Sequence, residues 1–311
     1  MKALHALGLD AGGSQTRWLL ISAGDQILAS GSAAGFSGMQ MNDASGRAAV
    51  DACVAGIARE VSEQAPDCRV GAVVAGVTGV GAGSPPLAAL LVERFAVEAA
   101  RVNVVADVEI AFRAAFAPGE GYLVYAGTGS IAAFIDGAGV LRRAGGRGVH
   151  LDDAGGGYWI AREALRRVWR REDEAPGAWH SSPMAEALFH AVGGDSSVNA
   201  ARFLMERTRG EVGRLALHVV NAAERDALAA EILTDAGREL ARLANAMQTR
   251  YGTRPVVVTG RAALMHPLIE RGIRAAVARE VAVQFREVDS TRAAARMAAA
   301  MLGPVPGAQR Q

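Results

Sequence analysis

Apolar positions follow two different periods along the chain, and their alternation predicts an α/β protein. Segments with helical spacing, at about residues 44–62 and 87–95, lie between apolar runs that are short enough to be strands. Because strands and helices alternate, we expect helices packed on a sheet rather than a sandwich of two sheets. The predicted strands of this section are residues 3–9, 18–21, 26–29, 70–77 and 102–106.

A second section of similar design follows APGEG at residues 117–121, which is the best candidate for a domain boundary. Residues 121–135, GYLVYAGTGSIAAFI, form an apolar strand, a tight Gly/Thr/Ser turn and a second strand, as residues 7–21 do. This repetition favours two related domains that face one another. The predicted domains are residues 1–117, which a helix at 290–302 can join, and residues 118–289.

The rest of the second section is predicted to be mostly helical. Helical spacing dominates from about residue 157 to 250, and an amphipathic helix starts near Tyr158. A buried strand, PVVVTG at 255–260, and a helix over roughly 264–280 follow. The tail from Gly303 contains Pro and Gly, and we expect it to fray.

Composition narrows the class of partner. The chain has 311 residues with 33 basic and 32 acidic side chains, and no run of Lys or Arg, so nucleic acid and acidic membrane surfaces are not expected partners. No signal peptide and no apolar stretch long enough to span a bilayer are predicted. Small molecules are therefore the expected partners. Cys53 and Cys68 have neither metal-ligand spacing nor the density of a disulfide scaffold, so we expect a cytoplasmic protein.

Two glycine-rich turns hold the first candidate chemistry. Glycine lets the backbone N–H groups of a turn approach phosphate oxygens closely, and nearby hydroxyl groups add donors. A plain hairpin connection is the alternative for either turn alone, and neither turn is a Walker A or a G-x-G-x-x-G motif. The presence of both favours a nucleotide. The turns consist of Ala11, Gly12, Gly13 and Ser14, and of Gly127, Thr128, Gly129 and Ser130.

Asp10 ends the apolar run before the first turn. A carboxylate beside a polyphosphate repels it unless a cation is present. Mg²⁺ uses few carboxylates, keeps several waters and bridges to phosphate oxygens, so Asp10 is a candidate Mg²⁺ ligand, acting through water.

Asp107 follows a buried strand and precedes the helical sequence EIAFRAAF. Ligands of open α/β sheets bind outside the carboxyl ends of the strands, which makes Asp107 a candidate general base for phosphoryl transfer. An N-cap of the following helix is an alternative that does not exclude this role.

Residues 144–168 have the highest density of candidate site residues, because three glycine clusters flank the adjacent acids Asp152 and Asp153. Such a segment is expensive in conformational entropy for a mere connector. A helix cap or a solvated loop charge is the alternative for either acid, and His150 is more typical of a loop histidine than of a catalyst.

The chain contains five motifs in the order GLDAGGSQT, VVADVEIAF, YAGTGS, GGRGVHLDDAGGGYWIAREAL and VVVTGRAALMHPLI. Together they resemble the N-acetylglucosamine kinase branch of the BadF/BadG/BcrA/BcrD ATPase family, in the actin-like/sugar-kinase superfamily. The resemblance implies two ribonuclease-H-like domains with a nucleotide- and sugar-binding cleft between them, and a homodimer. It implies ATP as a cofactor, beside the Mg²⁺ expected from Asp10, and an amino sugar, N-acetylglucosamine or glucosamine, as substrate.

The resemblance also implies residue roles. Asp107 matches the base that takes the proton of the sugar's 6-hydroxyl, and Asp10 belongs to the first phosphate loop. The nucleotide-binding positions are Asp10, Gly12, Gly13, Ser14, Gly127, Thr128, Gly129 and, in the adenosine loop, Gly260. The sugar-binding positions are Ser130, Gly146, Arg147, Gly148 and Asp153.

Three departures from the family pattern concern the sugar. Arg147 stands where Trp is usual, and Ala154 stands where Glu is usual. Gly38 and Met39 stand where an Asn often reads the sugar, and Asn42 can replace it only if the loop is shifted. Loss of a buried polar contact changes substrate choice by orders of magnitude.

Two other functions stay open: an activator ATPase of 2-hydroxyacyl-CoA dehydratases, and an ATP or sugar sensor without sugar phosphorylation. The activators hold an iron–sulfur cluster with cysteines near the second phosphate loop, and this chain has no Cys after position 68. The retained Asp107 favours catalysis over sensing.

Overall fold

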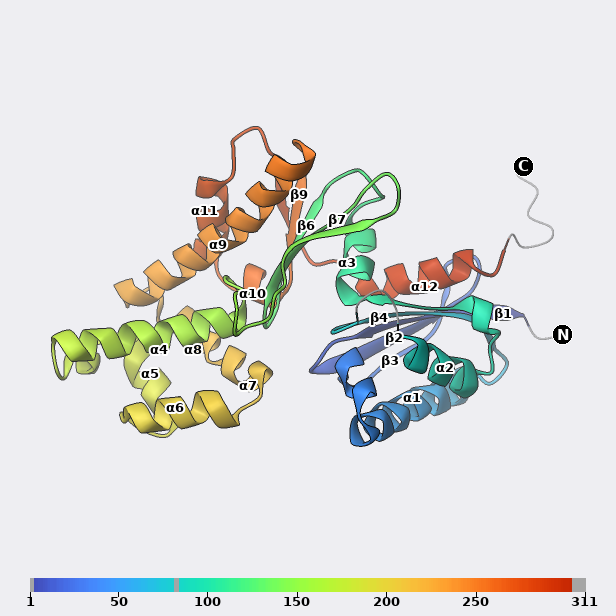
Figure 1. The fold of residues 1–311 in the computed structure, drawn as a ribbon, viewed down its shortest axis with the longest axis horizontal. Coiled ribbons are helices and arrows are strands. Elements are labelled where there is room, and N and C mark those ends of the chain that lie inside the picture. The colour runs from blue at the N-terminus through green and yellow to red at the C-terminus, as the bar shows by residue number, and fades with distance from the viewer. Residues whose placement is uncertain (1–2, 81–83, 304–311) are drawn as a thin grey trace. The chain divides into compact units, whose positions relative to one another are not determined.

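The computed structural model describes residues 3–80 and 84–303, and the contacts divide the chain into two compact units (Figure 1). The first unit comprises Met1–Ala115 and Val288–Gln311, and the second comprises Phe116–Glu287. The tail beyond Gly303, where fraying is predicted, lies outside the described residues.

Each unit is built on one five-stranded mixed sheet. The first contains β1 (Leu4–Ala11), β2 (Gln15–Ile21), β3 (Ile27–Ala34), η1 (Gly38–Asn42), α1 (Ala44–Gln64), β4 (Arg69–Val77), α2 (Pro85–Phe95), η2 (Ala99–Arg101), β5 (Val102–Ala106), α3 (Asp107–Ala115) and α12 (Ser290–Ala300). The second contains β6 (Tyr122–Ala126), β7 (Ser130–Ile135), β8 (Leu141–Gly145), α4 (Gly157–Glu174), η3 (Ala178–Ser181), α5 (Pro183–Val192), α6 (Ser197–Glu206), α7 (Arg209–Arg214), α8 (Ala216–Ala222), α9 (Ala227–Tyr251), β9 (Val256–Thr259), α10 (Arg261–Leu264), α11 (Pro267–Ala276) and β10 (Val283–Phe285).

The two sheets have the same topology. The first has the order β3-β2-β1-β4-β5, and the second, read from the matching edge, has the order β8-β7-β6-β9-β10. In each sheet three antiparallel strands come first in sequence, and two further strands then add in parallel. The repetition seen in the sequence is therefore a repetition of architecture, and the predicted α/β class is confirmed.

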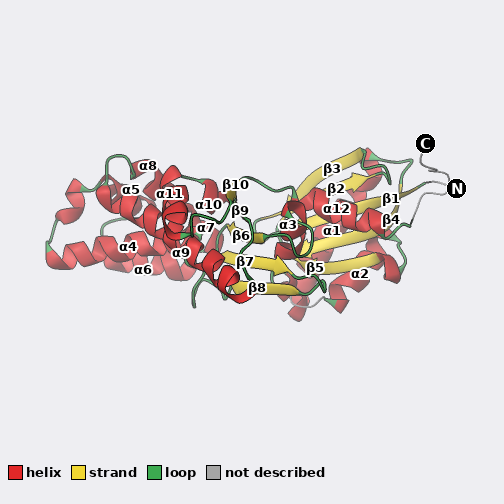
Figure 2. Cartoon of the chain, turned by 90° about the horizontal axis from the view of Figure 1, so that it is seen from above, coloured by secondary structure: helices red, strands yellow, loops and turns green. Residues whose placement is uncertain are grey.

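Alternation along β1 sorts the first unit into two helix layers. Leu7 and Leu9 pack with α1 and α2 on one face, whereas Ala6 packs with α12 on the other. Figures 1 and 2 show α12 lying across this sheet, on the face opposite α1 and α2. An added Cβ at Gly8 would lie 2.2 Å from the Ala295 nitrogen, so only glycine lets α12 come this close.

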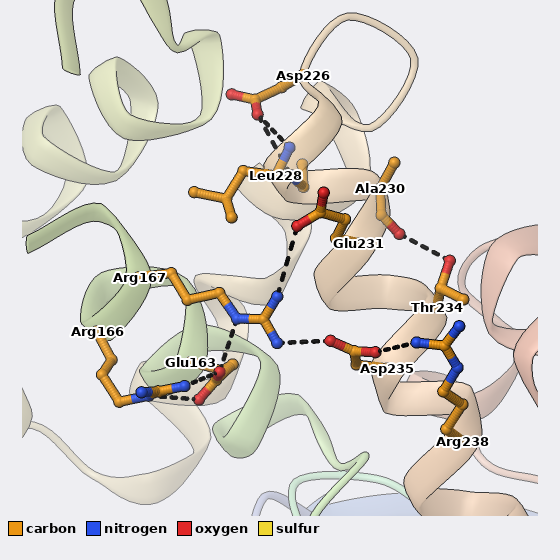
Figure 3. Close-up of polar contacts among 11 residues, drawn as sticks. Glu163, Arg166, Arg167, Asp226, Leu228, Ala230, Glu231, Thr234, Asp235 and Arg238 are labelled. Atoms are coloured by element: carbon orange, nitrogen blue, oxygen red, sulfur yellow. Dashed lines mark hydrogen bonds and ion pairs between the residues drawn. The ribbon is translucent and has the colours of Figure 1, made fainter. Parts of the chain in front are cut away.

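A network of ion pairs ties α4 to α9 in the second unit (Figure 3). The Arg167 guanidinium donates to Glu163 at 2.7 Å and to Asp235 at 2.5 Å, and Arg166 also pairs with Glu163. Glu163 is buried, and its paired carboxylate therefore avoids the cost of an isolated buried charge. This network fixes the position of α4, whose first residues support the second glycine-rich turn.

Two predicted elements have other bounds in the structure, and the strand β8 was not predicted. The helix predicted over roughly 264–280 is shorter: α11 runs from Pro267, where proline fits the first turn, to Ala276, and a separate short helix, α10, ends at Leu264. The strand predicted at 26–29 extends as β3 to Ala34, and β8 was missed because Arg142 and Arg143 interrupt its apolar pattern. Within the described residues, no helix is both long and apolar enough to cross a membrane.

Candidate functional site

The carboxyl ends of three parallel strands meet at one edge of the first sheet. β4 lies between β1 and β5, with Asp10 opposite Gly76, and Val77 opposite Ala106. Asp107 is the residue that directly follows β5 and begins α3. The topology therefore brings Asp10 and Asp107 to the same edge of the sheet, as expected for a ligand site of an open α/β sheet.

Asp107 is held in an environment that disfavours its charge. Burial raises the pKa of its carboxyl group, and the negative charge of Asp10 raises it further. The Val108 N–H, which donates to Asp107 Oδ1 at 2.8 Å, and the Thr78 side chain both lower the pKa. A carboxylate with a raised pKa is better suited to accept a proton than a fully solvated one.

Asp10 has a partner that the sequence analysis missed. Arg17 lies directly opposite Asp10 in the β1–β2 pairing, and its Nη2 donates to Asp10 Oδ2 at 2.7 Å. Burial raises the pKa of Asp10, and the Arg17 charge opposes this rise. The signal was available, because a hairpin that turns between Ala11 and Gln15 places Arg17 across from Asp10.

The donor set around Asp10 fits Mg²⁺ better than a transition metal. The described residues contain no group of three or more His, Cys, Asp or Glu side chains that could hold a metal ion. Mg²⁺ needs no such cage, since one carboxylate, waters and substrate phosphates complete its coordination.

The first glycine-rich turn is tight on one side and open on the other. The Gly12 N–H donates to the Gln15 carbonyl at 3.0 Å, and a Cβ at Gly35 would lie 2.4 Å from the Gln15 nitrogen. Gly35, which sequence analysis missed, therefore lets the turn rest on the end of β3. A Cβ at Gly13 would meet nothing within 4 Å, so the exposed side of the turn has room for a ligand.

The loop that precedes α1 is fixed against the end of β4. The Gly38 N–H and the Ser37 hydroxyl both donate to the Thr78 carbonyl, at 2.9 Å and 3.2 Å. A Cβ at Gly38 would lie 2.3 Å from Val80 Cγ2, so this loop has no space for a larger residue there. Asn42 lies at the end of η1 with an exposed side chain.

The second glycine-rich turn is supported by the start of α4. The Gly157 N–H donates to the Gly127 carbonyl at 2.9 Å, and the Tyr158 N–H donates to the Thr128 carbonyl at 3.0 Å. A Cβ at Gly156 would lie 2.7 Å from the Gly129 carbonyl carbon, so the turn and the helix are in backbone contact. The positive end of the helix dipole thus lies directly behind the turn, which favours an anion in front of it.

Asp153 is packed against the same turn. Its backbone is left-handed, with φ 51°, and the residue is 8% exposed. Its Oδ1 accepts the Gly148 N–H at 3.0 Å, and a Cβ at Gly129 would lie 2.2 Å from its Oδ2. Burial raises the pKa of Asp153, while the N–H groups of Gly148 and Arg147 and the charge of Arg209 lower it.

The other predicted residues of the second unit surround the turn. The Ser130 hydroxyl donates to the Ala154 carbonyl at 2.6 Å, so it can only accept a hydrogen bond from a ligand. The Gly146 N–H donates to the Ser130 carbonyl, and Arg147 is exposed. Gly260 has φ 95° and abuts the end of β6, because a Cβ there would lie 2.4 Å from the Ala126 carbonyl oxygen.

A known protein family and several solved structures match most of this chain. The model of the BadF/BadG/BcrA/BcrD ATPase family matches residues 7–287. Two similar solved structures are each named "Putative N-acetylglucosamine Kinase". The one from Chromobacterium violaceum has 23% identity and a TM-score of 0.74, covering 97% of this chain and 100% of that chain. The one from Porphyromonas gingivalis has 17% identity and a TM-score of 0.70, covering 96% and 97%.

A ROK family glucokinase from Streptomyces griseus, solved with glucose and AMPPNP, has 16% identity and a TM-score of 0.57, covering 96% of this chain and 98% of that chain. At these identities the likeness establishes the fold. A search of curated protein sequences finds no match.

The two units repeat one sheet topology, and the chain has the actin-like fold of these structures, built from two ribonuclease-H-like units. More narrowly, the chain belongs to the BadF/BadG/BcrA/BcrD ATPase family. The family membership predicted from the five motifs is therefore confirmed.

Proposed function

We propose that this protein is an ATP-dependent sugar kinase that phosphorylates the 6-hydroxyl of an amino sugar, N-acetylglucosamine or glucosamine. The observation that carries the proposal is Asp107, a carboxylate with a raised pKa at the strand edge that also holds Asp10. Family membership and the kinase names of similar structures support it.

The two glycine-rich turns are proposed to bind the phosphates of ATP. Gly12, Gly13 and Ser14 offer donors on the open side of the first turn, and Thr128 and Gly129 offer them in front of α4. Asp10 is proposed to hold Mg²⁺ through water. When bound, Mg²⁺ would neutralise phosphate charge that the Asp10 and Asp107 carboxylates would otherwise repel.

Asp107 is proposed to act as the general base. The 6-hydroxyl oxygen of the sugar forms a bond to the γ-phosphorus, the bond from this phosphorus to the bridging oxygen of ATP breaks, and ADP leaves. The hydroxyl proton goes to the Asp107 carboxylate as the new bond forms.

Sugar binding is proposed for one group of residues in the second unit. Asp153 and the N–H groups of the loop before it can pair with sugar hydroxyls, and Arg147 adds a cationic donor. The proposed group is Ser130, Gly146, Arg147, Gly148 and Asp153, and Gly260 is proposed to lie in the adenosine loop. We also propose that the protein is a cytoplasmic homodimer and that its domain boundary lies near residue 117.

The deciding experiment is ADP release by the purified protein with Mg·ATP. The panel is N-acetylglucosamine, glucosamine, N-acetylmannosamine, glucose and no sugar. We expect strong stimulation by an amino sugar, with a sugar 6-phosphate as product. Turnover that does not depend on sugar, or none, would contradict the proposal and favour an ATPase or a sensor.

A further inference from the structure

Thr78 and Asp107 leave neighbouring strands of the first sheet side by side. Val77, the last residue of β4, is paired in parallel register with Ala106, the last residue of β5. The residues that follow, Thr78 and Asp107, therefore occupy matching positions beyond the sheet. The Thr78 side chain lies close enough to the Asp107 carboxylate to lower its pKa.

The backbone of Thr78 is fixed from both sides. Its N–H donates to the Ala11 carbonyl at 2.9 Å, and its carbonyl accepts the N–H of Gly38 and the hydroxyl of Ser37. The next residue, Gly79, has φ 73°, and a Cβ there would lie 2.5 Å from Ser37 Oγ. Because the backbone cannot move freely, the Thr78 hydroxyl approaches Asp107 from a fixed point.

Besides Thr78, two main-chain N–H groups, those of Val108 and of Asp107 itself, lower the pKa of this carboxyl group. The Val108 N–H donates to Oδ1 from the first turn of α3. Both N–H groups belong to the same turn as the carboxylate, whereas Thr78 follows a neighbouring strand, so its hydroxyl adds a restraint on rotation about the Cβ–Cγ bond. A general base must hold one lone pair within hydrogen-bond reach of the proton that it accepts.

We propose that Thr78 is a positioning residue, whose hydroxyl holds the Asp107 carboxylate in the orientation that accepts the substrate proton. The inference rests on the proposed function, and it assigns to Thr78 a role that none of the sequence motifs indicated. It predicts that Thr78 acts through Asp107 and through no other group.

The test is a double-mutant cycle in the sugar-stimulated ADP assay. Thr78→Val keeps the shape of the side chain and the backbone hydrogen bonds but removes the hydroxyl. We expect kcat to fall about 10-fold, the size of one lost hydrogen bond to a charged group, with the KM values of ATP and sugar changed by less than about 2-fold. Thr78→Ser should restore most of kcat.

The cycle separates positioning from a structural effect. In an Asp107→Asn background, Thr78→Val should cost almost nothing further in kcat, because the group that it positions is gone. Thr16→Val is the matched control: the buried Thr16 hydroxyl donates to the Ala34 carbonyl at 2.9 Å, so its loss should lower the Tm and leave kcat near the wild-type value. If Thr78→Val fails to fold, Thr78→Ala takes its place.

Three outcomes would overturn the inference: wild-type kcat in a folded Thr78→Val protein, an equal loss of kcat in both backgrounds, or no rescue by serine. If Asp107→Asn itself keeps kcat, or no sugar stimulates the wild type, the proposed function fails and the role of Thr78 with it. Loss of kcat in Asp107→Asn with wild-type kcat in Thr78→Val rejects the role of Thr78 alone.

Discussion

The two units share one topology but support their glycine-rich turns in different ways. The first turn follows Asp10, rests on Gly35 and leaves Gly13 open. The second follows an uncharged strand end and is hydrogen-bonded to the N-terminus of α4. The first turn therefore directly follows a carboxylate, which suits a cation, whereas the second has the positive end of a helix dipole behind it, which suits an anion. The same topology therefore holds two turns in different electrostatic surroundings.

Carboxylates of the first unit differ in the direction of their pKa shifts. Burial raises the pKa of Asp10 and Asp107 at the strand ends. Two arginines, Arg296 and Arg292, instead hold the pKa of Asp25 well below its usual range. Asp10 also pairs with Arg17, but burial outweighs that charge, and a carboxylate whose pKa stays raised in a folded protein is a candidate for function.

The largest expected effect comes from removing the proton acceptor of the first unit. We expect Asp107→Asn to lower kcat by about 10²- to 10⁴-fold, the usual contribution of a general base, with little change in the KM of ATP. The sugar-dependent ADP assay measures both values.

Asp51→Asn is a matched control, because Asp51 pairs with Arg94 on the surface at 2.7 Å. This substitution should leave kcat unchanged. Near-normal kcat in a folded Asp107→Asn protein would remove Asp107 from the role of base.

The next effect tests the difference between the turns. Gly156→Ala places a methyl group against the Gly129 backbone, so we expect a loss of about 1–3 kcal/mol in the free energy of unfolding, as in other overpacked sites. Gly13→Ala adds the same methyl group in open space and should leave the unfolding free energy unchanged while raising the KM of ATP. Urea unfolding and steady-state kinetics distinguish the two.

If Gly13→Ala leaves the KM of ATP at the wild-type value, the open side of the first turn does not receive the nucleotide. Equal stability of Gly156→Ala and the wild type would contradict the backbone contact with α4.

Asp153 gives a smaller effect that is confined to the second unit. Asn tolerates the left-handed backbone of Asp153, so Asp153→Asn should fold and raise the KM of the sugar about 10-fold through loss of a charged acceptor. Asp152→Asn, next to it, is the control. An unchanged sugar KM in Asp153→Asn would place the sugar contacts elsewhere.

Sequence reasoning located what depends on local pattern. An apolar run that ends in an acid was enough to place Asp10 and Asp107 at strand ends, and glycine clusters were enough to find both turns. Arg17, Gly35 and Thr78 were missed because their importance depends on which strands pair and in what register. Parallel pairing between β4 and β5 joins segments that a helix separates in the sequence, and no local pattern encodes that register.

The smallest effect concerns stability and follows from the sign of the pKa shift. Because the pKa of Asp107 is raised in the folded protein, folding favours its protonated form. The group's contribution to stability is present below the ordinary carboxyl pKa and is lost as the pH rises through the raised value. At neutral pH, Asp107→Asn should therefore raise the Tm while it abolishes most activity, and the gain should shrink in acid. Thermal unfolding of both proteins from pH 7 to pH 4 measures this, and a Tm lowered at pH 7 would mean that the first unit tolerates its buried charge. A gain at neutral pH would show that the first unit gives up stability to keep a base at its strand edge.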